Sequence, residues 1–139
     1  MRAEPGPAFE LPAPLTLRLY RQEAVLFSSE KHWLHPLFDL EAFLAKGHDP
    51  AGTLLVDRIT GRAAAFLMAR LGLPRLHTGI LSRRAIPVLE QYGIAFQAGA
   101  IVDQIACATE EELGGVEDLD TAYGLLEARR NRAMGKSNL

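Results

Sequence analysis

The sequence has little cysteine, no long apolar run and no excess of basic residues, and each shortage excludes a class of protein. The single cysteine, Cys107, permits no internal disulfide and no cysteine cage for zinc within one chain. The longest apolar stretch, residues 63–69, is far shorter than the ~20 residues of a membrane-spanning helix. The proline-broken N-terminus also lacks the apolar core of a signal peptide. We therefore expect a soluble, cytoplasmic protein without membrane partners.

The charge balance argues against general nucleic-acid binding. Fifteen Lys and Arg against 17 Asp and Glu give a net charge of −2 over 139 residues. A protein that binds nucleic acid through its phosphates usually carries a basic surplus. With 48% hydrophobic and 23% charged residues, the composition is instead typical of a globular domain.

Proline and apolar residues divide the chain into three parts. Four of the eight prolines lie in residues 1–14, which predicts an extended arm without a core of its own. Residues 15–130 carry the apolar patterns of a single domain. Residues 131–139 are polar, and we expect them to form a flexible tail.

Apolar periodicity within the domain predicts an alternation of strands and helices. Alternating or continuous apolar runs predict a hairpin over 15–20 and 24–27, followed by strands at 53–56 and 75–81 and by a further strand that starts at 94–96. Helical spacing predicts helices at 36–46, 61–71 and 83–92, and a last one carrying Leu119, Ala122, Tyr123 and Leu126. The unbroken apolar run at 53–56 is typical of a strand covered on both faces. This order predicts a three-layer α/β/α domain with a mixed sheet and helices on both faces.

The strongest candidate site follows the two strands of the predicted βαβ unit. Parallel strands end at the same edge of a sheet, where ligands of open α/β sheets usually bind. Each strand is followed by a helix, whose first N–H groups favour an anion. The residues at these two strand ends are Asp57, Arg58, Thr60, Gly61 and Arg62, and then Ser82, Arg83 and Arg84.

Two interpretations of these residues remain open. In the first, seven of these residues bind a ligand. Asp57 accepts a hydrogen bond from its hydroxyl or amine, and Thr60 and Ser82 donate. Arg58, Arg62 or Arg83 pairs with its phosphate or carboxylate, and Gly61 lets the backbone approach closely. In the second, Asp57 caps the helix that follows, Arg58 and Arg62 are solvated, and Gly61 relieves crowding at the helix start. The chain contains no phosphate-loop or dinucleotide glycine pattern.

Other chemically versatile residues have simpler explanations. His32 and His35 have a spacing that suits metal ligands, but no third ligand lies nearby in the sequence, so we predict neither a metal site nor a cofactor. Cys107 lies in an apolar run and is interpreted as a small core residue. The run Glu110–Glu112 is interpreted as solvated.

A family resemblance adds to this picture. The segment 57–65, Asp-Arg-Ile-Thr-Gly-Arg-Ala-Ala-Ala, resembles the signature of a small bacterial and archaeal family known as domain of unknown function 1893. The likeness continues through Ile80-Leu81-Ser82 and through residues 89–94, and in weaker form it covers about residues 15–128. The resemblance implies a cytidine-deaminase-like three-layer fold.

The residues do not support the zinc chemistry of deaminases. Those enzymes place His or Cys with Glu at one helix start and a Pro-Cys-x-x-Cys motif at the next. The corresponding segments here, 60–63 and 82–85, contain no Cys, His or Glu. A Cys-Pro-Met-Glu element of the family is also replaced, by Gly-Gly-Val-Glu at 114–117.

Three hypotheses follow from the sequence. The first is a non-catalytic, deaminase-like binding module for a small anionic or nucleotide-like ligand. The second is a metal-independent hydrolase or transferase with Asp57 as the general base, which requires a raised pKa of that carboxyl. The third is a homo-oligomeric interaction protein.

Overall fold

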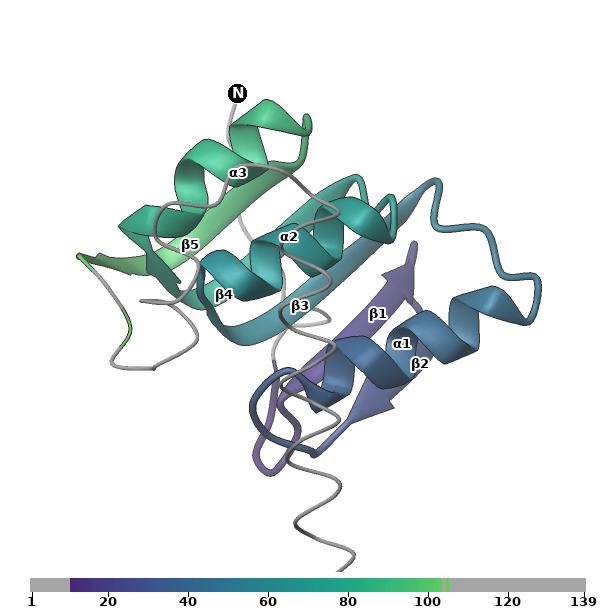
Figure 1. Ribbon diagram of the computed structural model, residues 1–139. Helices are drawn as coiled ribbons and strands as arrows, with labels where there is room; N and C mark the ends of the chain where they lie inside the picture. Colours follow the sequence, from purple (N-terminus) through teal and green to yellow (C-terminus); the bar gives the residue numbers. More distant parts are fainter. Residues whose placement is uncertain (1–10, 104, 106–139) are drawn as a thin grey trace, which may run out of the picture.

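The computed structural model describes residues 11–103 and 105. In chain order, the elements are β1 (Leu17–Arg21), β2 (Ala24–Ser29), α1 (His35–Ala45), β3 (Thr53–Thr60), α2 (Arg62–Arg70), β4 (Arg75–Ser82), the 3-10 turn η2 (Arg83–Ala85), α3 (Ile86–Gln91) and β5 (Ala95–Val102) (Figure 1). None of the described helices is long and apolar enough to cross a membrane.

The strands form one mixed sheet in the order β2-β1-β3-β4-β5. Strand β1 pairs antiparallel with β2 and β3, whereas β3, β4 and β5 are parallel. The α/β class, the hairpin and the parallel βαβ unit predicted from the sequence are therefore confirmed.

The three described helices lie side by side on one face of this sheet, with α2 packed between α1 and α3 (Figure 1). The described part of the chain thus has two layers. The helix expected around Leu119–Leu126, on which the predicted third layer depends, lies outside the described residues.

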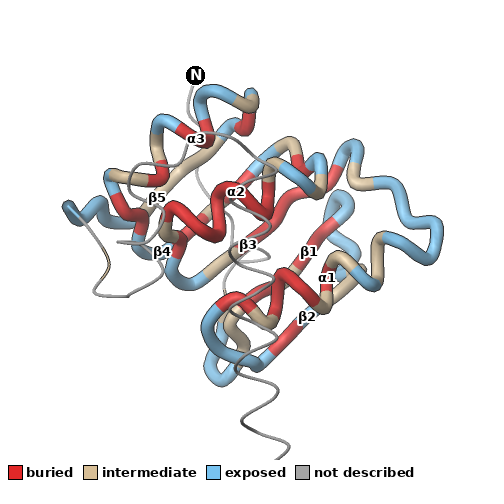
Figure 2. Tube along the Cα trace, viewed as in Figure 1, coloured by how far each residue is buried: buried red, intermediate tan, exposed pale blue. Residues whose placement is uncertain are grey.

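Helix α2 occupies the centre of the helical layer, as its apolar residues on nearly every side predict. Residues 62–68 are all buried, and three successive alanines let this helix lie close to the sheet and to its neighbours (Figure 2). Phe66 is one of the largest side chains that are almost completely buried in the described structure. The main core forms where α2 meets β1, β3 and β4.

Strand β3 is buried on both faces at its beginning. Leu55 belongs to the core under the helices, whereas Leu54 and Val56 pack with Tyr20 and Leu11 in a second cluster. Neighbouring residues of a strand point to opposite faces, so these two clusters lie on opposite sides of the sheet. The interpretation of residues 53–56 as a doubly covered strand is confirmed.

Two predicted boundaries were wrong. Strand β3 continues to Thr60, whereas the sequence analysis ended it at residue 56. The polar residues in this extension suggested a loop, but pairing with β4 keeps it in the sheet. The strand predicted to start at residue 94 is β5, which runs from Ala95 to Val102. The predicted helix 83–92 is divided into η2 and α3, because Pro87 lacks an N–H and is tolerated only in the first turn of a helix.

A row of close backbone approaches crosses the three parallel strands near their carboxyl ends. A Cβ atom added to Gly79 would lie 2.9 Å from the carbonyl oxygen of Arg58, and one added to Gly99 would lie 2.9 Å from the carbonyl oxygen of Gly79. The alternation of side chains between the two faces of the sheet shifts at this row. In a regular strand, residues five apart point to opposite faces, yet Leu76 and Leu81 both belong to the core under the helices.

We expect Gly79→Ala to lower the free energy of unfolding by about 1–2 kcal/mol. The new methyl group would force the backbones of β3 and β4 apart, which outweighs the smaller gain from a stiffer unfolded chain. Urea unfolding measures the change, with the exposed Ala100→Ser as a control that should alter stability by less than about 0.5 kcal/mol. An unchanged unfolding midpoint for Gly79→Ala would show that the close approach imposes no constraint.

Candidate functional site

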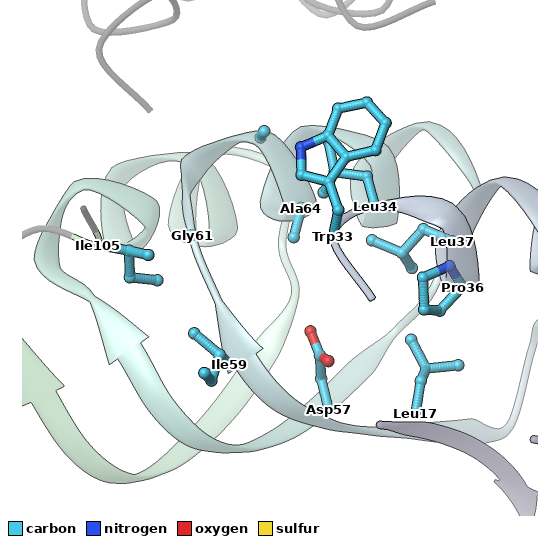
Figure 3. A pocket seen from close by; sticks show the side chains of 11 residues that line it. Leu17, Trp33, Leu34, Pro36, Leu37, Asp57, Ile59, Gly61, Ala64 and Ile105 are labelled. Atoms are coloured by element: carbon cyan, nitrogen blue, oxygen red, sulfur yellow. The ribbon is translucent and has the colours of Figure 1, made fainter. Parts of the chain in front are cut away.

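A pocket of about 220 Å³ opens where strands β1 and β3 meet the beginnings of α1 and α2 (Figure 3). The side chains of its described lining residues are apolar or aromatic apart from one carboxyl group. These residues are Leu17, Trp33, Leu34, Pro36, Leu37, Asp57, Ile59, Gly61, Ala63, Ala64 and Ile105. Asp57 is the only ionisable side chain among them.

Strand β3 directs the carboxyl of Asp57 into the pocket (Figure 3). The side chain is half-buried, and the hydroxyl of Thr60 lies 2.9 Å from its Oδ2 atom. Removal from water raises the pKa of Asp57 from its usual 3.8 to about 7, although hydrogen bonds with Thr60 and with the backbone at Arg58 and Ile59 favour the ionised form. Asp57 therefore exchanges a proton near neutral pH.

Thr78 extends the polar contacts of Asp57 into the sheet. Its hydroxyl lies 2.9 Å from that of Thr60, and both threonines are buried. Thr78 is the direct neighbour of Asp57 in the parallel pairing of β3 and β4. The sequence analysis did not single out Thr78, because only the strand register shows that it lies beside Asp57.

Trp33 stands at the mouth of the pocket (Figure 3). Its ring lies 5.1 Å from that of His35 and 6.1 Å from that of Phe38, and 36% of the residue is exposed. Its φ angle of 61° is rare for a bulky residue and indicates backbone strain that the surroundings maintain. The sequence analysis missed this residue, and a lone tryptophan before a helix carries no signal of such a role.

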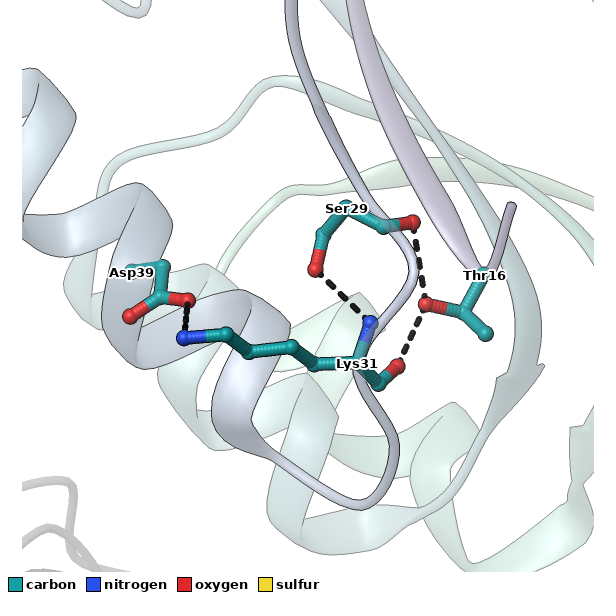
Figure 4. A network of polar contacts seen from close by, with 4 residues as sticks. All are labelled: Thr16, Ser29, Lys31 and Asp39. Atoms are coloured by element: carbon teal, nitrogen blue, oxygen red, sulfur yellow. Dashed lines mark hydrogen bonds and ion pairs between the residues drawn. The ribbon is translucent and has the colours of Figure 1, made fainter. Parts of the chain in front are cut away.

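A polar network anchors the segment that leads to Trp33 (Figure 4). The ammonium group of Lys31 lies 2.7 Å from the carboxylate of Asp39, on helix α1. The Lys31 N–H donates to the hydroxyl of Ser29, and the hydroxyl of Thr16 lies 2.6 Å from the Lys31 carbonyl oxygen. These contacts fix both ends of residues 29–31 and so restrict where the chain enters α1.

The first turn of α2 forms part of the pocket wall. Gly61, Ala63 and Ala64 line the pocket, and the first N–H paired within this helix is that of Ala65, to the Gly61 carbonyl. The N–H groups of Ala63 and Ala64 have no acceptor within the helix because they belong to its first turn. The turn that lines the pocket together with Asp57 therefore contains N–H groups that have no intrahelical acceptor.

The arginines that follow Asp57 do not line the pocket. Arg58 donates to the carbonyl oxygens of Leu11 and Leu15. Arg62 is buried, and it donates to the carbonyl oxygen of Arg84 at 3.1 Å. Its guanidinium carbon also lies 5.1 Å from the centre of the Phe66 ring. Both arginines hold parts of the fold together instead of facing the carboxyl.

The candidates at the end of β4 are likewise separate from the pocket. Ser82 accepts a hydrogen bond from the N–H of Arg84 at 3.2 Å and so caps the 3-10 turn that follows β4. Arg83 pairs with Asp103 at 3.3 Å in an exposed contact. Of the seven predicted ligand-binding residues, Asp57 and Gly61 line the pocket and Thr60 bonds to Asp57, whereas the other four lie outside its lining.

The structural alternative for Asp57 was wrong. Gly61 is the N-cap of α2, and no side chain caps this helix. Arg62, which that alternative placed in solvent, is only 8% exposed. Asp57 is thus a pocket residue and not a helix cap.

Other predictions of the sequence analysis remain as they were. Within residues 11–103 and 105, no three His, Cys, Asp or Glu side chains gather as a metal site. His35 begins α1 beside Trp33, as described above. Cys107 and the run Glu110–Glu112 lie outside the described residues.

Comparisons with known proteins agree with this fold. A family model described as a domain of unknown function, DUF1893, matches residues 13–127. The crystal structure of a DUF1893 family protein from Thermotoga maritima aligns with a TM-score of 0.74 and 20% identity, over 83% of this chain and 80% of that chain. No curated protein matches.

Proposed function

Because the chain belongs to the DUF1893 family, whose description assigns no activity, we propose a function from its pocket: binding of a small, neutral, nucleobase-like heterocycle. The observation that carries this proposal is the placement of Asp57. Among the described lining residues it is the only ionisable group, and the first turn of α2 lines the same pocket. Such a pocket, with few polar groups in fixed positions, is typical of small-molecule sites.

The size and the walls of the pocket favour a small planar ligand. A volume of about 220 Å³ is below the range of about 300–1,000 Å³ that holds drug-sized molecules. The ring of Trp33 at the mouth offers a face for stacking, and the side chains of Leu17 and Leu37 provide apolar contacts. A flat aromatic ring with one polar edge fits this combination.

The two polar components of the pocket complement a lactam edge, in which a ring N–H lies next to a carbonyl group. The N–H would donate to Asp57, and the carbonyl oxygen would accept from the first turn of α2. An anionic ligand has less support, since no lysine, arginine or histidine lines the pocket in the described residues. The nucleobase-like part of the sequence-based hypothesis is therefore retained, and its anionic part is not.

We expect uracil or hypoxanthine to raise the melting temperature of the protein, and inorganic phosphate or acetate to leave it unchanged. A ligand at a hundred times its Kd adds about 2.7 kcal/mol to the free energy of unfolding, which gives a clear shift. Asp57→Asn should weaken binding at least about ten-fold, since it removes a charge-assisted hydrogen bond.

Arg83→Ala serves as the matched control for this measurement, because Arg83 lies outside the pocket lining and should not affect heterocycle binding. A phosphate-induced shift that disappears in Arg83→Ala would contradict the proposal and favour an anion site at the end of β4. The absence of any heterocycle-induced shift would also contradict it.

A metal-independent enzyme is the second candidate, and the raised pKa of Asp57 favours it. A carboxyl with a pKa of about 7 is suited to general acid–base catalysis near neutral pH. If the reaction is a hydrolysis, water would cleave the glycosidic bond of a nucleoside of these heterocycles to give the free base and the sugar, as followed by NMR. Turnover that is lost in Asp57→Asn, with the fold retained, would favour this candidate over simple binding.

A further inference from the structure

We propose that Thr78 is a positioning residue of this site. Acting through Thr60, it stabilises the protonated form of Asp57 when no ligand is bound, an effect called proton storage below. A ligand then binds by donating an N–H to the carboxylate and displacing that proton. The choice of ligand rests on the proposed function. The proton storage itself rests on the geometry of three side chains and can be tested without any ligand.

The three side chains form a continuous chain of oxygen atoms that leads away from the pocket. The Oδ2 atom of Asp57 lies 2.9 Å from the Thr60 hydroxyl, which lies 2.9 Å from the Thr78 hydroxyl. The Thr78 hydroxyl is in turn 3.2 Å from the carbonyl oxygen of Ile80. Thr60 is fully buried and Thr78 is 6% exposed, so these hydroxyls depend largely on one another for hydrogen bonds.

Each hydroxyl has one proton, so the chain has two consistent directions. When Asp57 is ionised, Thr60 donates to Asp57 and Thr78 donates to Thr60. When Asp57 carries its proton on Oδ2, it donates to Thr60, Thr60 donates to Thr78, and Thr78 donates to the carbonyl of Ile80. Only the second direction needs an acceptor beyond Thr78, and the carbonyl oxygen of Ile80 provides it. Thr78 therefore connects Thr60 to this acceptor.

Few other charges act on Asp57 from the elements packed around it. The lining residues from β1, α1, α2 and the segment at Ile105 are not ionisable. On α2, Arg62 is held by the Arg84 carbonyl. On α1, the ring of His35 packs edge-on against that of Trp33, 5.1 Å away. Arg58, the neighbour in β3, favours the ionised form, but its guanidinium group bonds to the carbonyls of Leu11 and Leu15.

Two valine substitutions should shift the pKa of Asp57 in opposite directions. Thr78→Val leaves the Thr60 proton without an acceptor in the protonated state, so it should lower this pKa and increase the acid dissociation constant about ten-fold. Thr60→Val removes the donor to the ionised carboxylate, so it should raise the pKa. A loss of packing would not produce such opposed shifts.

The test is a carboxyl-carbon NMR titration of the full chain in the absence of ligand. Wild type, Thr60→Val, Thr78→Val and Thr78→Ser are compared, with dispersed amide spectra as the check of folding. Serine retains the hydroxyl, so Thr78→Ser should restore the wild-type titration even if valine perturbs the packing. Shifts of the same sign in both valine variants, or an unchanged pKa in Thr78→Val, would overturn the proposal.

Uracil titrations at different pH values then connect the chain to the ligand. Binding to wild type should weaken about ten-fold per pH unit below the pKa of Asp57, and in Thr78→Val this loss should begin at a lower pH. Opposed pKa shifts without uracil binding would refute the proposed function and leave the proton storage supported. Uracil binding that does not depend on pH would overturn the displacement of the proton.

Discussion

Asp57→Asn is expected to stabilise the protein above neutral pH, although it removes the central polar group of the pocket. The folded state raises the pKa of Asp57 from 3.8 to about 7, so the folded protein binds this proton more tightly than the unfolded chain does. The stability due to the protonated carboxyl is fully present below about pH 4 and is lost as the pH rises towards 7. Asparagine is neutral at every pH and avoids this loss.

The magnitude follows from the size of the pKa shift. Each pKa unit corresponds to about 1.4 kcal/mol, so the ionised carboxylate would cost the folded state up to about 4 kcal/mol. Partial exposure to solvent reduces this cost, and we expect a gain of about 2–3 kcal/mol for Asp57→Asn at pH 8. Such a gain from removing a functional group is typical of sites that trade stability for function.

Urea unfolding at pH 4 and pH 8 measures this effect. Wild type should be less stable at pH 8 because of Asp57, and the substitution should remove that part of the pH dependence. Asp39→Asn is the matched control, because Asp39 forms an exposed ion pair with Lys31 and its loss should cost less than about 1 kcal/mol. Equal destabilisation of Asp57→Asn at both pH values would contradict the argument.

Phe66→Ala is expected to lower the free energy of unfolding by about 3–5 kcal/mol, the largest loss that we predict. Phe66 is 1% exposed and lies in the centre of α2, between three alanines and the residues Leu67 and Met68. The neighbouring alanines cannot extend into the space that the ring leaves. The Arg62 guanidinium would also lose the ring that it lies against, at the helix start that lines the pocket.

Phe43→Ala provides the comparison for this substitution in the same unfolding experiment. Phe43 is only partly buried, and its ring packs against Phe27 and stacks on His48 near the surface. It should therefore cost clearly less than Phe66→Ala. Similar losses for the two variants would show that the alanine-rich helix repacks around a missing ring.

The order of the elements could be predicted because local patterns determine it. The alternation in Leu17–Tyr20, the apolar run 53–56 and the glycine after α2 each indicate one element without reference to the rest of the chain. The continuation of β3 through Asp57 and Arg58 could not be predicted in this way. Asp57 remains in the strand because it pairs with Leu17 of β1 and Thr78 of β4, and the N–H of Arg58 donates to the carbonyl of Thr16.

The same strand explains why the sequence identified the site only in part. With residues 57–62 interpreted as a loop, Asp57, Arg58 and Arg62 were all free to face one ligand. In a strand, Asp57 and Arg58 point to opposite faces, so only one of them reaches the pocket. Thr78 comes from another strand and Trp33 from the connection before α1, and neither position follows from spacing along the chain.

The left-handed backbone at Trp33 has a practical consequence. This residue is the only tryptophan in the chain, and the strained turn holds its indole at the pocket mouth, partly exposed to water. The emission of an indole depends on the polarity around it, so the intrinsic fluorescence of the unlabelled protein comes mainly from this one place. The fold thus carries its own optical reporter of the pocket, at the position where an incoming molecule would displace water from the ring.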